Sequence, residues 1–217
     1  MRPENQHLEA LQDIRQMMQR SSRFISLSGL SGIAAGMWAL AGAYIAHNWI
    51  RDARVETTGG YTRGYPAFYN DQLVWNLLLL ATAVAGAALL TAFYFTWRRT
   101  KETKTALWNH TSKQLAINTL IPLAAGGLFL LAMLQQNEWR FIAPGSLIFY
   151  GLALVNGSKY TLSDIRYLGI LEIILGLLAT QFLGYGLYFW AFGFGVLHII
   201  YGFIMWWKNE RKPAVAQ

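Results

Sequence analysis

Six apolar runs, each 17 to 25 residues long, make up most of this 217-residue chain and constrain its fold more than any other feature. A run of about 20 apolar residues is long enough for a helix to cross a hydrocarbon core about 30 Å thick. Every backbone polar group inside that core must be bonded within the segment, so each run is expected to be helical. The predicted spans are 24–46, 73–97, 115–134, 141–157, 166–183 and 187–207.

The composition agrees with a membrane protein. Only 13% of the residues are charged and 54% are hydrophobic, whereas a soluble domain carries about a quarter charged residues. Little chain remains for a separate soluble domain. The sequence therefore predicts an all-α fold: a cytoplasmic amphipathic segment over residues 1–22, a polytopic six-helix transmembrane domain over 23–207, and a cytoplasmic tail over 208–217.

The distribution of basic residues predicts the topology. If the N-terminus is cytoplasmic, 14 of the 18 lysines and arginines fall on the cytoplasmic side. Such an excess is the positive-inside signal. We therefore expect a multi-pass protein of the bacterial inner (cytoplasmic) membrane with both termini in the cytoplasm. The net charge of +7 then records topology and does not indicate a nucleic-acid partner. The four outer residues are Arg51, Arg54, Arg63 and Arg140.

Residues 4–20 show the apolar spacing of an amphipathic helix. Leu8, Leu11, Ile14 and Met18 are three or four residues apart and share one face. The helix either lies on the inner leaflet with its arginines at lipid headgroups or docks a cytoplasmic protein partner. The sequence leaves both alternatives open.

Two nine-residue stretches, GILEIILGL at 169–177 and GVLHIIYGF at 195–203, share one template with a single ionisable residue at the fourth position. That residue is Glu172 in the first stretch and His198 in the second. Each lies thirteen residues from Tyr185, the midpoint of the short turn between the last two spans. An antiparallel hairpin therefore places both at one depth, about 10–15 Å from the cytoplasmic helix ends. We expect their side chains to be hydrogen-bonded or one water apart.

Glycines flank both ionisable residues at helical spacing, which indicates close backbone packing. The same symmetry about Tyr185 predicts that Gly169 faces Gly202 and that Gly176 faces Gly195. A third set of glycines with this spacing lies in the first span and offers a surface to receive the hairpin. Its members are Gly29, Gly32 and Gly36.

An intramembrane pair of this kind has two interpretations. Pairing relieves the cost of placing an ionisable group in hydrocarbon, either as an ion pair or as a hydrogen bond between neutral groups. The contact then serves as interhelical glue, or it exchanges protons or binds a ligand. The chain has no cysteine, no zinc-protease or serine-hydrolase motif and no phosphate-binding glycine loop. We therefore expect no enzyme activity, no metal site and no cofactor.

Three stretches in the second half of the chain carry a resemblance: INTLIPLAAGGLF, IAPGSLIFYGLALVNGSKYTLSDIRYLGILEIILGL and FWAFGFGVLHIIYGFIM. They resemble a family of small six-span bacterial inner-membrane proteins. The similarity includes Glu172 and His198 and implies a bacterial inner-membrane setting. It implies no substrate, cofactor or catalytic residue.

Two functions follow as hypotheses. The first is a small proton-linked transport or permeation protein with Glu172 and His198 at its centre, working as a homo-oligomer in the lipid bilayer. The second is a membrane-embedded regulatory or scaffold protein whose N-terminal helix binds a cytoplasmic partner. Water access to the pair favours the first hypothesis, and a dry, purely structural contact favours the second.

Overall fold

The computed structural model describes residues 28–56, 61–62, 65–66, 71–103 and 110–209, and they are almost entirely helical. The long helices are α2 (Gly29–Glu56), α3 (Asp71–Thr103), α4 (His110–Gln135), α5 (Ile142–Gly157), α6 (Asp164–Gln181) and α8 (His198–Asn209). Short helical turns η1 (Trp139–Phe141), η2 (Ser158–Tyr160) and η3 (Leu183–Tyr185) lie at helix ends. Strands β1 (Tyr61–Thr62) and β2 (Tyr65–Pro66) form a small antiparallel pair. The predicted amphipathic segment 1–22 lies outside the described residues.

Five helices are long and apolar enough to cross a membrane by length and composition. They are Gly29–Ala53, Gln72–Lys101, His110–Gln135, Trp139–Tyr160 and Leu183–Lys208. Helix α6 is not among these five. It has only 18 residues, and three of them are charged: Asp164, Arg166 and Glu172. Each of the five apolar helices contains an 18-residue stretch with at most two charged residues. The all-helical prediction is confirmed, and a membrane location is plausible from the five apolar helices.

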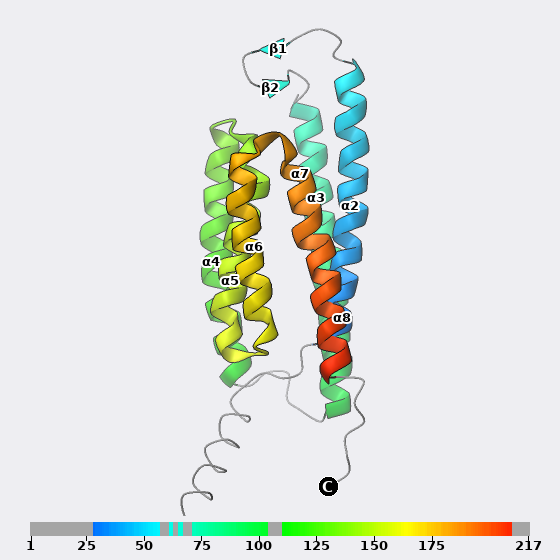
Figure 1. The fold of residues 1–217 in the computed structure, drawn as a ribbon, viewed down its shortest axis with the longest axis vertical. Coiled ribbons are helices and arrows are strands. Elements are labelled where there is room, and N and C mark those ends of the chain that lie inside the picture. Colours follow the sequence, from blue (N-terminus) through cyan, green and yellow to red (C-terminus); the bar gives the residue numbers. More distant parts are fainter. Residues whose placement is uncertain (1–27, 57–60, 63–64, 67–70, 104–109, 210–217) are drawn as a thin grey trace, which may run out of the picture.

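The helices form two groups that stand side by side (Figure 1). In one group α5 packs between α4 and α6, and in the other α2 packs between α3 and the last helix of the chain. The two groups meet where α5 and α6 face that last helix. The consecutive helices α3 and α4 therefore belong to different groups, because α3 packs on α2 while α4 packs on α5.

The last helix is continuous but contains an irregular middle segment. It consists of α7 (Gly186–Trp190), a π-helical segment η4 (Ala191–Leu197) and α8. A π-helical segment has wider turns than an α-helix and often occurs at functional sites. Here it ends immediately before His198, so it changes which backbone carbonyl lies beside that side chain.

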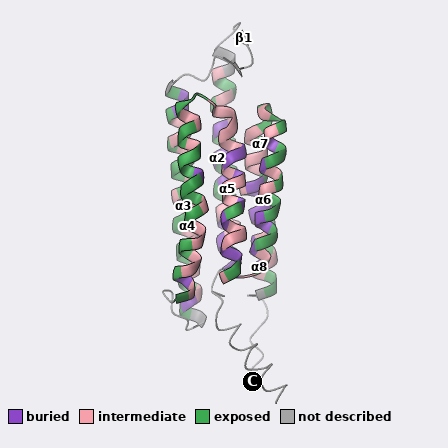
Figure 2. Ribbon diagram, turned by 90° about the vertical axis from the view of Figure 1, so that its left-hand side faces the viewer, coloured by how far each residue is buried: buried purple, intermediate pink, exposed green. Residues whose placement is uncertain are grey.

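Much of the molecular surface is apolar, as expected of helices in contact with lipid. Figure 2 shows α3 and α4 largely exposed, and only 11% and 6% of their apolar spans are buried. Large side chains on these two helices remain exposed, among them Leu79, Leu89, Leu90, Phe93, Ile117, Leu120, Ile121 and Leu128. A protein in water would not leave so many of them uncovered.

The glycines of the last two spans pack differently from the sequence prediction. A Cβ at Gly169 would lie 2.7 Å from the carbonyl oxygen of Gly151 on α5, and one at Gly176 would lie 2.9 Å from that of Pro144, also on α5. On the last helix, Gly195 and Gly202 pack against α2. The expected facing of Gly169 with Gly202 and of Gly176 with Gly195 is therefore wrong. Each glycine face is occupied by a third helix instead.

The glycines of the first span do meet the last helix. A Cβ at Gly36 would lie 2.6 Å from the carbonyl oxygen of Gly195, and one at Gly32 would lie 3.1 Å from the Cα of Gly202. A Cβ at Gly29 would collide with the backbone of Gly202 and Trp206. Helices α2 and α8 thus approach backbone to backbone, as small residues permit in membranes.

Candidate functional site

Glu172 lies near the middle of α6 and is fully buried. Neither of its carboxylate oxygens has a hydrogen-bond partner among the described residues. Buried polar groups in proteins are nearly always bonded, and an exception calls for an explanation such as a functional role or a bound water or ion. Glu172 is therefore the most unusual polar group in the described part of the chain.

His198 is the first residue of α8 and is only 7% exposed. Its Nδ1 lies 3.0 Å from the carbonyl oxygen of Gly193, and its Nε2 lies 2.8 Å from the hydroxyl of Tyr150. The carbonyl can only accept, so Nδ1 carries a proton and donates it to Gly193. In neutral imidazole Nε2 then accepts from the Tyr150 hydroxyl, and in imidazolium Nε2 donates to it.

The structure brings Glu172 and His198 together. His198 Nδ1 lies 3.5 Å from Glu172 Oε1, which is within ion-pair range. This distance is longer than a good hydrogen bond, and the Nδ1 proton is directed to Gly193. The side chains are therefore adjacent without being directly hydrogen-bonded, although the sequence predicted either a direct bond or a single intervening water.

Tyr150 is a member of the site that the sequence reasoning missed. It lies in the middle of α5, eight residues after the first residue of that helix. Its ring packs 4.9 Å from the ring of Phe194 and 5.4 Å from that of His198, measured between centroids. Tyrosines in membrane spans usually lie at the interfaces, where the hydroxyl reaches water. A tyrosine at the centre of the 141–157 run was a signal that its hydroxyl needs an internal partner.

Gly193 completes the site through the π-helical segment. It is five residues before His198, and its carbonyl accepts the Nδ1 proton. A Cβ at this position would lie 2.5 Å from Glu172 Oε2 and 2.5 Å from a methyl of Leu147. Gly193 therefore supplies both a hydrogen-bond acceptor for the imidazole and the space that the carboxylate occupies.

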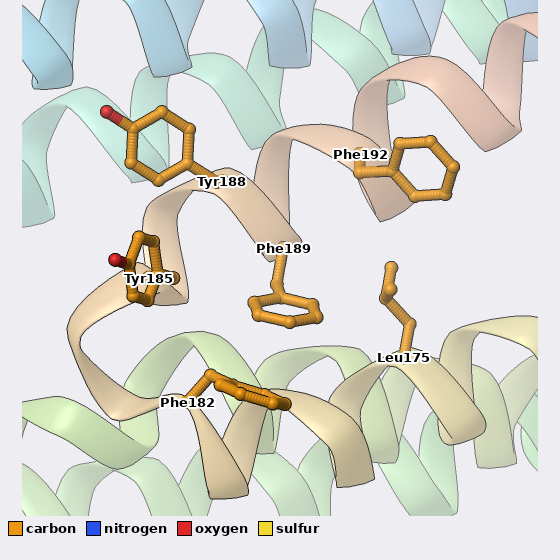
Figure 3. A pocket seen from close by; sticks show the side chains of 6 residues that line it. All are labelled: Leu175, Phe182, Tyr185, Tyr188, Phe189 and Phe192. Carbon is orange, nitrogen blue, oxygen red and sulfur yellow. The ribbon is translucent and has the colours of Figure 1, made fainter.

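An apolar groove of about 480 Å³ lies near the site, between the C-terminal end of α6 and α7 (Figure 3). Leu175 stands at one end of it, and Tyr185 and Phe182 at the other. A Cβ at Gly193 would also lie 3.1 Å from a methyl of Leu175. Leu175 thus lies between the groove and the region of the carboxylate, and the groove does not reach Glu172.

The three polar side chains come from three helices: Tyr150 from α5, Glu172 from α6 and His198 from α8. Each can hold or pass a proton. Among the described residues, no group of three or more histidines, cysteines or carboxylates is placed to hold a metal ion. The arrangement is therefore suited to proton exchange between neighbouring side chains.

Comparison with known proteins finds no matching family model, curated protein or solved structure. The interpretation of the site therefore depends on its own geometry.

Proposed function

We propose that the protein is a small proton-linked transport or permeation protein of the bacterial inner membrane, with Tyr150, His198 and Glu172 forming a proton relay. The observation that supports this most strongly is the fully buried Glu172 carboxyl, which has no hydrogen bond within the described part of the chain and lies 3.5 Å from a histidine that is bonded at both ring nitrogens. Ionisable residues inside membrane spans commonly mark proton or ion pathways.

The geometry allows a balanced transfer. A proton that arrives at Nε2 through the Tyr150 hydroxyl converts the imidazole of His198 to imidazolium. The Nδ1–H bond then breaks. Its proton leaves the hydrogen bond with the Gly193 carbonyl and passes to the ionised carboxylate of Glu172. The products are a neutral carboxylic acid and a neutral imidazole that carries its proton on Nε2. To complete the cycle, the Glu172 carboxyl must release its proton, and the imidazole must gain a proton at Nδ1 and lose the proton on Nε2 to the Tyr150 side.

A purely structural contact fits these distances less well. Polar residues that hold membrane helices together do so through hydrogen bonds between them. Here His198 bonds across helices to Tyr150 through Nε2, whereas its Nδ1 donates to Gly193 within its own helix and no described residue donates to the carboxyl of Glu172. A side chain that served only to join α6 to α8 would be expected to accept that proton directly.

The proposal includes six spans with both termini in the cytoplasm. Helix α6 lies between α5 and α7 in the chain and runs alongside α5 over a similar height (Figure 1). Its charged residues Asp164 and Arg166 lie in the first turn, near the proposed cytoplasmic surface, and Asp164 pairs there with Lys208 at 3.0 Å. Glu172 is then the sole acidic or basic side chain in the rest of α6.

The test is proton flux into liposomes that contain the purified protein and an internal pH-sensitive dye. A potassium gradient with valinomycin supplies the driving voltage. We expect flux above that of protein-free liposomes, and we expect Glu172→Gln and Tyr150→Phe to lower it about a hundredfold or more, because one positioned proton-transfer group contributes about 10²–10⁴-fold in catalysis.

Asp164→Asn is the matched control, because it also neutralises one carboxylate of α6, but at a half-buried position at the end of the helix, where Asp164 pairs with Lys208. This control should retain the flux of the parent. Flux equal to that of empty liposomes, or equal flux in Glu172→Gln and the parent, would contradict the proposal. The scaffold alternative has one observation in its favour: Glu172 is fully buried, and the neighbouring groove does not reach it. Its partner-binding segment, residues 1–22, lies outside the described residues.

A further inference from the structure

A cavity of about 800 Å³ lies between the two helix groups at their outer end. Its walls come from α2, α3, the η1–α5 corner and the η3–α7 segment. This volume is within the range of small-molecule and cofactor sites. It is separate from the proposed relay. Trp190 lines the cavity, and its ring centroid lies 5.1 Å from that of Phe194 in a tilted contact. The Phe194 ring in turn packs on Tyr150 and His198.

The cavity is divided into an apolar end and a cationic end. On α2 its lining extends from Gly42 to Arg51. Nine residues of helix correspond to about 14 Å, which is about half of a hydrocarbon core about 30 Å thick. Gly42 and Val84 mark the end nearest the membrane centre, and Arg51 and Arg140 mark the outer mouth. The cavity therefore has the length and polarity of one lipid in one leaflet.

The two arginines at the mouth are unusual for this side of the chain. Only four of the 18 basic residues are expected on the outer side, and two of these four line the same cavity. Arg51 contacts Asp52 at 3.3 Å, with both side chains more than 60% exposed. Such a pair is weak in water, so the Arg51 guanidinium can leave Asp52 and bind a phosphate group instead.

Arg140 is held in place more firmly. Its Nε and one terminal nitrogen both donate to the Glu138 carboxylate, at 2.6 Å and 3.1 Å, and its guanidinium lies over the ring of Phe141. A planar guanidinium presents five N–H donors and binds phosphate oxygens well. Two arginines from different helix groups therefore provide donors for a phosphate at the level of the lipid headgroups. The nearby ring contact of His47 with Tyr188 joins the same two walls.

We propose that this cavity binds a single phospholipid of the outer leaflet, with its phosphate between Arg51 and Arg140 and an acyl chain against α2 and α3. The proposal does not depend on proton transfer at Glu172. Asp52 and Glu138 also lie near the mouth, so the phosphate, and not the net charge of the headgroup, is the chemistry that the site recognises.

The experiment uses the purified full-length chain in nanodiscs that contain equal amounts of dioleoyl phosphatidylglycerol and a galactosyl dioleoylglycerol, which has the same chains without phosphate. Native mass spectrometry then identifies the lipids that remain bound after the nanodisc is removed. We expect one retained phosphatidylglycerol per chain and little galactolipid. Arg51→Gln should lower the ratio of phosphatidylglycerol to galactolipid about tenfold, as expected for loss of a charged hydrogen bond.

Two further variants separate the headgroup from the chain. Ala81→Leu places a larger side chain at an exposed position of the cavity wall and should reduce retention of both lipids. Lys159→Gln removes one positive charge at the other end of the molecule, where Lys159 contacts Asn156, and should leave retention unchanged. Equal retention of the two lipids by the parent, no retained lipid, or equal effects of Arg51→Gln and Lys159→Gln would overturn the proposal. Thermal melting of each variant verifies that it is folded.

Discussion

Replacement of Gly202 by alanine tests the close approach of α2 and α8 directly. The added Cβ would lie 2.6 Å from the backbone nitrogen of Ile33, 2.7 Å from the carbonyl oxygen of Gly29 and 3.0 Å from the carbonyl carbon of Gly32. Ordinary carbon contacts are about 3.5–4.0 Å. All three neighbours are backbone atoms, so no side-chain rotation relieves the overlap, and the two helices must separate.

The size of the effect follows from two opposing contributions. Overpacking of a tight site costs about 1–3 kcal/mol, and the rigid neighbours favour the upper end of this range. Alanine in place of glycine in a helix returns about 1 kcal/mol. We therefore expect Gly202→Ala to lower the free energy of unfolding by about 2 kcal/mol.

Gly127 on α4 provides the matched control, because a Cβ there meets nothing within 4 Å among the described residues. Gly127→Ala should keep the helix-propensity gain of about 1 kcal/mol. The two variants should then differ by about 3 kcal/mol, or roughly 6–12 °C in Tm for a chain of this size. Thermal unfolding of both proteins in the same detergent measures this difference. Equal Tm values would refute the backbone contact between α2 and α8.

Three further outcomes are expected. A double-mutant cycle of Glu172→Leu and His198→Leu should give a coupling free energy of about 0.5–2 kcal/mol in unfolding experiments. The coupling should differ between about pH 5 and about pH 8 if the pair titrates. Strictly additive effects would mean that the two side chains do not interact. Lys208→Gln should cost less than about 1 kcal/mol, because the Lys208 side chain is 55% exposed and such ion pairs are weak, and a larger loss would assign Lys208 a structural role beyond that pair. Topology reporters fused at Thr58, Thr103, Gln136 and Gln217 should lie outside, inside, outside and inside the cell, in that order. A C-terminal reporter found outside would exclude the proposed topology.

The sequence was sufficient for the features that depend on local pattern. Run lengths and composition predicted helices of membrane-spanning length, because a bilayer requires both apolar side chains and internally bonded backbone. Counting from Tyr185 placed Glu172 and His198 at one depth, because a short turn fixes the register of an antiparallel hairpin. In the structure the two side chains are 3.5 Å apart.

The choice of helix partners was decided only by the tertiary structure. Glycine spacing identified which faces pack closely, but Gly169 meets α5 and Gly202 meets α2, since spacing along one helix says nothing about which other helix occupies its face. Tyr150 could not be assigned to the site from the sequence for the same reason: it is 48 residues from His198 and lies on a different helix. Gly193 reaches His198 through a π-helical segment, and wider turns of this kind arise from packing between helices and leave no mark in a 3.6-residue pattern.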